Sequence, residues 1–410
     1  MKAGVPVLLV GTGGYGQGYV EALLGPAGHG ARIAGAVETR PENMSRLREL
    51  FPGTPAYETM EEFYQRHEAD LAVISTPFHL HRAQCVTALE HGSHVLCEKP
   101  LCSTVEDARE IINARDRAGR FVAVGYQWCY SDAVRELKRD ALAGRLGRPK
   151  RMRTIVLSPR TNAYYNRAPW AGRLRDDSGA PVLDSVAANA CAHYLFNMLY
   201  VLGGSMEESA WPGPVTAELY RANPIESFDT TAARIRTGDG VELLFYASHA
   251  TGEALGPVFH YEYEQADVYF DTDWEGRPDH RNPAVRRGSI WAAFHNGSHK
   301  VYGDPHADEM RKLEMSIRAA RGDAAVLCPP EAAMAHTDCI ARMHRASPEI
   351  VTFPPAMAGY DACGDAGRAL TYVRGLEEAL ARCYDLGLLP GEAGLAWAAS
   401  GRAAGAAGRS

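Results

Sequence analysis

A glycine-rich run near the start of the sequence has the residue types and spacing of a diphosphate site. Gly11, Gly13 and Gly16 form a G-x-G-x-x-G pattern behind the apolar run 5–10. In such a turn the first glycine permits a tight bend, the second lets the backbone approach a pyrophosphate, and the third allows close helix–strand packing. The helix that follows would stabilise the anion through its free amides. The residues expected to contact a dinucleotide here are Gly11, Thr12, Gly13, Gly14, Tyr15 and Gly16.

An acidic residue further along favours one of the two common dinucleotides. Glu38 ends the second apolar segment, about 20 residues after Gly16, where a carboxylate binds the ribose 2′-hydroxyl of NAD and repels a 2′-phosphate. Arg40 could take that phosphate, so NADP stays open, but Glu38 makes NAD the preferred cofactor. Thr39 lies between them and is also expected to contact the cofactor.

Short apolar segments alternate with helical patterns around these residues. This rhythm is typical of a parallel sheet with helices on both faces. We therefore expect a Rossmann domain over residues 1–128. The expected strands are 5–10, 32–37, 71–74, 95–97 and 121–124, and the expected helices are 15–24, one starting near Pro41, 79–90 and 104–117 with Thr104 as its cap.

The pattern changes after Tyr126, where longer alternating strands predict a sheet with one covered face. We expect an α+β domain with a large, mainly antiparallel sheet over 129–388, and a disordered tail over 389–410. The overall class is α/β. The expected strands are 151–157, 215–220, 230–236, 241–249 and 260–270, and the expected helices are 132–143, 184–202, 306–321, 331–346 and 362–386.

The composition excludes several classes of partner. The 410 residues carry a net charge of −7, which disfavours nucleic acid and anionic membranes. No apolar run approaches the ~20 residues that span a bilayer. The nine cysteines are scattered, so we expect reduced thiols in a cytoplasmic protein. Four histidines share no metal-ligand spacing, and no metal is expected: His79, His81, His91 and His94.

Four further motifs follow the glycine run in order. They occupy residues 75–81, 88–100, 124–127 and 146–149, and the second ends in Glu-Lys-Pro. Together they resemble the Gfo/Idh/MocA family of oxidoreductases over most of the chain. The resemblance implies a NAD(P)-dependent dehydrogenase acting on a hydroxyl-bearing carbon of a sugar, cyclitol or related polyol. It also implies pairing of subunits through the large sheet, as a homodimer or homotetramer.

The resemblance assigns roles around Glu98-Lys99-Pro100. Lys99 would lie beside the nicotinamide and bind the substrate hydroxyl, Glu98 would help position it, and Pro100 would follow a cis peptide bond. An ammonium there stabilises the charge that develops on an alkoxide. A surface Glu-Lys pair ahead of a helix is the alternative. The other expected cofactor contacts are Thr76, Pro77, His79, His81, Glu98 and Gln127.

The family's second catalytic pattern, Asp-x-x-x-His, is matched by Asn189 and His193. Helical spacing would put both side chains on one face. His193 suits a general acid/base, because imidazole titrates near neutral pH, although a buried core histidine is the alternative. Asn189 departs from the aspartate and cannot accept a proton. Asp184 could supply the missing carboxylate, but we expect it to act as a helix N-cap with Ser185.

An irregular stretch rich in aromatic residues and arginine, residues 164–173, is the candidate wall of the substrate pocket between the two domains. Aromatic faces stack on sugars and forked donors bind their hydroxyls. An interface loop of an oligomer is an equally weighted alternative. The expected substrate contacts are Lys99, Tyr126, Trp128, Tyr165, Arg167, Trp170, Asn189 and His193.

Two other functions stay open at this stage. Some relatives resemble glycosidases that oxidise, eliminate, add water and reduce on one bound NAD. A non-catalytic regulator that binds dinucleotide or sugar is also compatible with Asn189, although the retained Lys99 and His193 argue against it.

Overall fold

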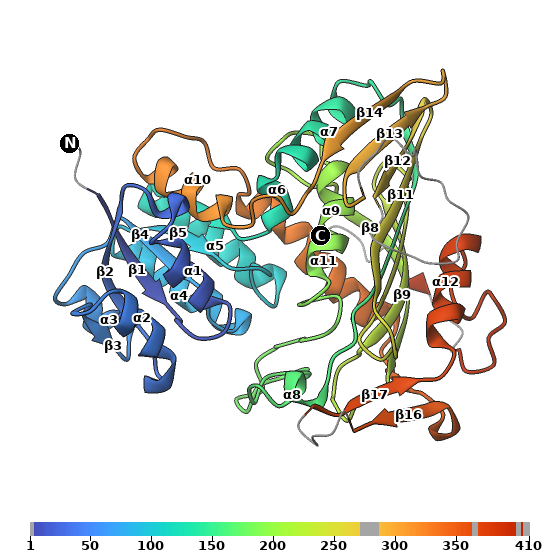
Figure 1. The fold of residues 1–410 in the computed structure, drawn as a ribbon, viewed down its shortest axis with the longest axis horizontal. Coiled ribbons are helices and arrows are strands. Elements are labelled where there is room, and N and C mark those ends of the chain that lie inside the picture. The colour runs from blue at the N-terminus through green and yellow to red at the C-terminus, as the bar shows by residue number, and fades with distance from the viewer. Residues whose placement is uncertain (1–3, 271–286, 363–367, 399–402, 405–410) are drawn as a thin grey trace. The chain divides into compact units, whose positions relative to one another are not determined.

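The computed structural model describes residues 4–270, 287–362, 368–398 and 403–404. Contacts divide the chain into two compact units, traced in Figure 1. The first comprises residues 1–131 and 306–337, and the second comprises residues 132–305 and 338–410.

The first unit is built on a six-stranded parallel sheet. Its strands lie in the order β3-β2-β1-β4-β5-β6, so the order reverses between β1 and β4. Open α/β sheets bind ligands at such a reversal, beyond the carboxyl ends of the strands. The expected Rossmann fold is confirmed. The strands are β1 (Val5–Val10), β2 (Ala31–Val37), β3 (Ala56–Tyr57), β4 (Leu71–Ile74), β5 (His94–Cys97) and β6 (Val122–Val124).

Helices connect these strands. The central strand β4 is buried along its whole length, as expected for a strand covered on both faces. Thr104 caps α5 as predicted, because its hydroxyl accepts a hydrogen bond from the Asp107 amide at 3.1 Å. The helices are α1 (Gly16–Ala22), α2 (Ser45–Leu50), α3 (Met60–Tyr64), α4 (His81–Glu90), α5 (Val105–Ala118) and α6 (Gln127–Tyr130).

A helix from far along the chain completes the first unit. Leu313 and Ile317 of α10 (Arg311–Ala320) are fully buried in the same core as Val7 and Leu9 of β1. This helix was expected to belong to the second domain. Its amphipathic pattern predicts a buried face, but it does not say which apolar surface that face covers.

The second unit contains a ten-stranded mixed sheet, in the order β14-β13-β12-β11-β7-β10-β9-β8-β15 with β18 beside β8. The pairs β7·β10 and β8·β15 are parallel and the others antiparallel. The expected single strand 260–270 is two strands joined by a turn. The strands are β7 (Pro149–Leu157), β8 (Pro212–Arg221), β9 (Thr230–Thr237), β10 (Glu242–Ser248), β11 (Leu255–Tyr263), β12 (Ala266–Phe270), β13 (Ile290–Phe294), β14 (His299–Gly303), β15 (Val351–Thr352) and β18 (Ala403–Ala404).

The remaining elements belong to the second unit, except that residues 330–337 of α11 belong to the first. The helix expected over 184–202 begins only at Ala192, and the one expected over 362–386 is replaced at its start by β17, while residues 363–367 lie outside the described part. The elements are α7 (Asp132–Leu142), α8 (Asn162–Tyr165), α9 (Ala192–Val201), α11 (Pro330–Ala346), α12 (Leu376–Leu386) and the hairpin β16 (Ala358–Asp361) with β17 (Leu370–Val373).

The start of the segment expected to be a disordered tail packs on the sheet, whereas residues 399–402 and 405–410 lie outside the described part. Residues 389–398 were expected to be disordered, yet Leu389 is buried in the core under α12. Trp397 packs edge-on against Tyr220 of β8, with ring centroids 5.1 Å apart. The few large apolar residues among alanines and glycines are enough to anchor this segment to the sheet.

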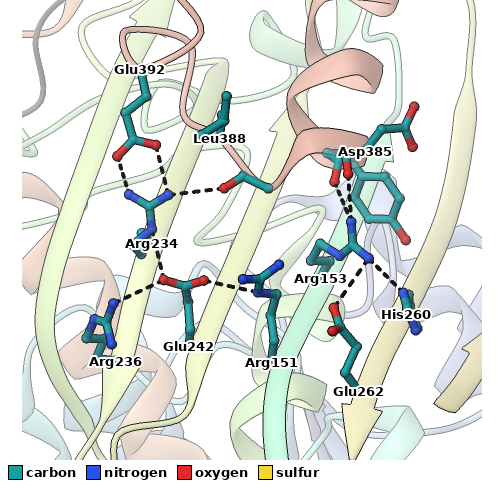
Figure 2. Close-up of polar contacts among 12 residues, drawn as sticks. Arg151, Arg153, Arg234, Arg236, Glu242, His260, Glu262, Asp385, Leu388 and Glu392 are labelled. Atoms are coloured by element: carbon teal, nitrogen blue, oxygen red, sulfur yellow. Dashed lines mark hydrogen bonds and ion pairs between the residues drawn. The ribbon is translucent and has the colours of Figure 1, made fainter.

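A charged network ties α12 to the sheet (Figure 2). Arg153 on β7 donates to the carbonyl oxygens of Tyr384 and Asp385, at 3.1 and 2.9 Å. The last carbonyls of a helix have no intrahelical partner and carry partial negative charge, so a guanidinium stabilises them. In a neighbouring group of contacts, Arg234 on β9 pairs with Glu242 on β10 at 3.2 Å.

Candidate active site

The glycine-rich loop after β1 has the tight geometry that its sequence predicts. Gly11 has φ of +82°, a conformation that glycine adopts without strain, and its amide donates to Val37 O at 2.9 Å. A Cβ on Gly16 would lie only 2.4 Å from the Gly11 carbonyl oxygen. The first turn of α1 can therefore approach β1 only without a side chain at this position. Among the described residues, no atom lies within 4 Å of a Cβ built on Gly14, so the loop is open there.

Glu38 lies directly after β2 and faces this loop. Its Oε2 accepts hydrogen bonds from the Thr12 amide at 3.0 Å and the Thr12 hydroxyl at 3.3 Å. Its Oε1 accepts from the Arg40 amide at 3.0 Å. Partial burial raises the pKa of Glu38, but these hydrogen bonds outweigh it and lower the pKa overall. An ionised carboxylate beside an open glycine loop fits a dinucleotide with an unmodified ribose.

Lys99 follows β5 at the same edge of the sheet. Its side chain is partly exposed, its amide donates to Glu98 Oε2 at 3.0 Å, and its peptide bond to Pro100 is cis. Because the carboxyl ends of parallel strands meet at one edge, the fold gathers there the loop after β1, Glu38 after β2 and Lys99 after β5.

The side chain of Glu98 is buried, contrary to the prediction that it contacts the cofactor directly. Its carboxylate is 6% exposed and accepts a hydrogen bond from the Tyr19 hydroxyl at 2.5 Å. It also forms an ion pair with Lys312 of α10, which is 1% exposed. Sequence reasoning missed Lys312. The available signal was a lysine beside Leu313 on the apolar face of an amphipathic helix.

His81 is also a supporting residue rather than a cofactor contact. The ring is fully buried, with Nδ1 3.0 Å from Pro100 O and Nε2 3.0 Å from Thr76 O. Burial lowers the pKa of His81, so the neutral ring links the loop after β4 to the loop after β5. The prediction of a direct contact was wrong because the first turn of α4 directs this side chain inward.

Two aromatic residues expected at the substrate lie in the core of the first unit. Tyr126 is fully buried against His336, with ring centroids 5.7 Å apart. Trp128 is 1% exposed, and its Nε1 lies 3.5 Å from His306 Nδ1. Buried rings cannot stack on a sugar, so these two expectations were wrong. Gln127 between them is partly exposed and donates weakly to Glu309 at 3.4 Å.

In the second unit, Asn189 precedes the helix that carries His193. Because α9 begins at Ala192, the expected arrangement of both side chains on one helix face does not form. The Asn189 Nδ2 instead donates to Asp184 Oδ1 at 2.9 Å. The amide at position 189 is thus held by a carboxylate from five residues earlier.

Asp184 is not a helix N-cap, which corrects the prediction. The carboxylate is 2% exposed, and Oδ2 accepts from the Gly172 amide at 2.7 Å. Arg167 pairs with the same oxygen at 3.6 Å. The preceding Leu183 has φ of +57°, which costs about 1–2 kcal/mol for a residue with a Cβ. Buried contacts on both sides of this strained residue keep the segment in place.

The aromatic stretch brings its arginine to this carboxylate. The guanidinium of Arg167 lies 3.8 Å from the ring centroid of Tyr164 and 4.6 Å from that of Trp170. Both Arg167 and Trp170 remain partly exposed. Tyr165 is also partly exposed, but its hydroxyl oxygen is buried, and burial raises the pKa of that hydroxyl well above the ordinary value. Arg167 and Asp184 thus form one polar cluster with Asn189.

The described residues hold no group of three or more His, Cys, Asp or Glu side chains placed to bind a metal. Among the helices of the described segments, none combines the length and hydropathy needed to cross a bilayer.

Residues 5–126 match the sequence profile of the Gfo/Idh/MocA family, described as an oxidoreductase family with an NAD-binding Rossmann fold. The Rossmann unit of this chain is thus similar to the NAD-binding domain of that family. The match confirms the expected NAD-binding fold and the resemblance inferred from the motifs.

Individual relatives match over part of their length. A 1,5-anhydro-D-fructose reductase from Ensifer adhaerens is 36% identical over 136 residues, which is 32% of this chain and 39% of the relative. A 2,7-anhydro-N-acetylneuraminate hydratase from Mediterraneibacter gnavus is 25% identical over 210 residues, 50% of this chain and 52% of the relative. The chain therefore spans about half the length, or less, of these curated relatives.

Similarity of fold covers more of the chain than these sequence matches do. The crystal structure of the WlbA dehydrogenase from Bordetella pertussis, in complex with NADH and UDP-GlcNAcA, has a TM-score of 0.67 at 21% identity. The superposition covers 84% of this chain and 97% of that one. Both units thus share the fold of that enzyme.

Proposed function

We propose that this chain is a NAD(H)-dependent dehydrogenase acting on a hydroxyl-bearing carbon of a sugar, cyclitol or related polyol in the cytoplasm. The observation that carries the proposal is the gathering of the glycine loop, Glu38 and Lys99 at the carboxyl edge of one parallel sheet. The names of relatives, among them an anhydrofructose reductase, support a sugar-like substrate.

The chemistry of each residue suggests its role in the reaction. When bound, the nicotinamide accepts or donates the hydride. We propose that Lys99 Nζ donates a hydrogen bond to the substrate oxygen and stabilises the negative charge that develops there. His193 is proposed to take the hydroxyl proton, because imidazole exchanges protons near neutral pH.

Asn189 has a different role from the aspartate that it replaces. Its Nδ2 donates to Asp184, so its orientation is set by a carboxylate. We propose that its Oδ1 accepts a hydrogen bond from a substrate hydroxyl, with Arg167 and Trp170 as further substrate contacts and Tyr165 supporting them. The proposed further cofactor contacts are Thr39, Arg40, Thr76, Pro77, His79 and Gln127.

Calorimetry on the purified chain tests the cofactor. We expect NAD to bind about 10-fold or more tightly than NADP, because Glu38 repels a 2′-phosphate. Detection of neither dinucleotide would refute the proposed function. Sedimentation of the same sample tests the proposed homodimer or homotetramer.

Turnover across a panel of sugars, cyclitols and polyols tests the reaction. We expect reduction of NAD by at least one of them, and Lys99→Ala should lower kcat by about 100-fold or more. Full activity of Lys99→Ala on an identified substrate would remove Lys99 from the mechanism. The matched control is Lys150→Ala, on the exposed start of β7 in the second unit.

A redox-neutral reaction is the second candidate, and the hydratase among the relatives favours it. In that case purified protein would retain tightly held NAD, and its redox state would not change over complete turnover of a glycoside or anhydrosugar. A third outcome, dinucleotide binding without turnover of any tested substrate, would favour a regulatory protein.

A further inference from the structure

A lysine from far along the chain is buried at the carboxyl edge of the Rossmann sheet. Lys312 is the second residue of α10 and is 1% exposed. Its Nζ forms an ion pair with Glu98 Oε1 and lies 3.4 Å from the carbonyl oxygen of Gly125. A lysine is almost never buried so fully unless a partner compensates its charge, so the ion pair is what allows this position.

Glu98 connects this lysine to the loop that carries Lys99. While Oε1 binds Lys312 and Tyr19, Oε2 accepts a hydrogen bond from the Lys99 amide at 3.0 Å. A Cβ on Gly125 would lie 2.7 Å from Oε1, so the glycine there leaves room for the carboxylate. The orientation of one buried carboxylate therefore sets the backbone of Lys99.

The same ammonium contacts the glycine-rich loop. Lys312 Nζ lies 4.4 Å from the ring centroid of Tyr15 and 5.3 Å from that of Tyr19. Both distances suit cation–π attraction, which strengthens when the cation is removed from water. Tyr15 is a member of the glycine-rich loop and is 46% exposed, so its other side faces solvent.

We infer that Lys312 is a positioning residue that fixes the glycine-rich loop and the Lys99 loop relative to each other. It acts on Lys99 through Glu98 and on the glycine-rich loop through Tyr15. The inference rests on the proposed function, since these two loops acquire their roles from it. A second consequence follows from charge: without Lys312, Glu98 would keep its hydrogen bonds from Tyr19 and the Lys99 amide but lose its buried ion-pair partner.

The pKa values agree with a charged pair in the intact protein. Burial raises the pKa of Glu98, but the nearby ammonium of Lys312 outweighs burial and lowers it overall. Burial lowers the pKa of Lys312, and Glu98 more than restores it. The other titratable or charged groups near Glu98 are Tyr15, Tyr19, His81, Cys97, Lys99 and Tyr126.

Three variants test the role by kinetics: Lys312→Met, Lys312→Arg and Lys312→Met with Glu98→Gln. In Lys312→Met, we expect kcat near neutral pH to fall about 10-fold, because a protonated Glu98 binds the Lys99 amide more weakly. The pH profile of kcat should gain an ionisation that the wild type lacks, with kcat rising as Glu98 ionises. The double variant should lose that ionisation, and Lys312→Arg should restore most of kcat.

Urea unfolding measures the same titration without any activity. In Lys312→Met we expect burial to hold the folded-state pKa of Glu98 above its unfolded value, so stability relative to the wild type should fall as pH rises through that range. The double variant has no carboxyl group at position 98 and should show no such dependence. Leu313→Ala, on the same helix in the same core, is the matched control for loss of packing.

The outcomes separate the two proposals. If Lys312→Met loses stability as Leu313→Ala does and its pH profile keeps the wild-type shape, Lys312 is only structural and the inference is wrong. If the wild type binds no NAD(H), the proposed function fails and the positioning role with it, whatever the unfolding experiment shows.

Discussion

Replacing Asp184 should reveal how much one buried carboxylate holds the segment before α9 in place. Its two short hydrogen bonds, from Gly172 N at 2.7 Å and Asn189 Nδ2 at 2.9 Å, each contribute about 1.5–3 kcal/mol as bonds to a charged group. The Arg167 pair at 3.6 Å involves a side chain that is 28% exposed and adds little. We therefore expect Asp184→Ala to lower the free energy of unfolding by about 3–5 kcal/mol.

Asp184→Asn removes the negative charge of the side chain but keeps its size and shape. An amide fills the same space but can accept only through its single oxygen, so one of the two donors would face an NH2 group. We expect a loss of about 1–3 kcal/mol, less than for alanine. Relaxation of Leu183 from φ of +57° would offset about 1 kcal/mol of the loss in either variant.

The assay is urea unfolding at pH 7, with the denaturant slope compared between variants. Asp177→Asn is the matched control, because Asp177 pairs with Arg173 in the same stretch and is 87% exposed, so the loss of stability should be below about 1 kcal/mol. If Asp184→Asn were as mild as Asp177→Asn, the reasoning from buried hydrogen bonds would be refuted. A rise in KM with little change in kcat would further indicate that Asp184 acts by holding Asn189.

Three more outcomes can be measured on the same protein. Glu38→Ala should weaken the binding of NAD about 10-fold or more and reduce the ratio of NAD affinity to NADP affinity, as measured by calorimetry. An unchanged ratio would contradict the assignment of Glu38 to the ribose. Burial lowers the pKa of His249 to about 3 in the folded protein, so as pH falls this histidine is protonated first in the unfolded protein. The wild type should therefore lose up to about 1.4 kcal/mol of stability per pH unit below 6.5. His249→Gln should reduce that slope between pH 6.5 and 4.5, and an unaltered slope would show that other groups cause it. Arg153→Met should cost about 1–3 kcal/mol by removing the contacts to the end of α12. Arg236→Met, which removes a mostly exposed arginine from its ion pair with Glu242 on the same sheet, should cost less than about 1 kcal/mol.

Local sequence patterns predicted the Rossmann unit well because its signals are local. Apolar strands, the glycine spacing and Glu38 need only neighbouring residues to be read, and the structure contains each of these elements. The strands of the second unit were found less completely. The turn that separates β11 from β12 interrupts a continuous apolar alternation, and the sequence there carries no glycine or proline to mark it.

Predictions failed where a side chain could face either a ligand or the core. His81, Tyr126 and Trp128 have the chemistry of site residues, but their elements direct them inward. Asp184 has the residue type of an N-cap, yet α9 starts eight residues later and the carboxylate binds Gly172 and Asn189 instead. Residue type describes what a group can bind, and only the surrounding chain decides what it does bind.

The sequence by itself determined the class of fold, the edge of the sheet where the dinucleotide loop lies, and Lys99 as the residue to test. Those features follow from strand order and short-range spacing, which physical chemistry constrains tightly. The tertiary structure decided that Lys312 pairs with Glu98 across more than half the chain, and that Asp184 holds Asn189. Such contacts depend on which charged and polar groups are buried next to each other in the folded chain. The pairing matters for stability because an unpaired buried charge is strongly destabilising.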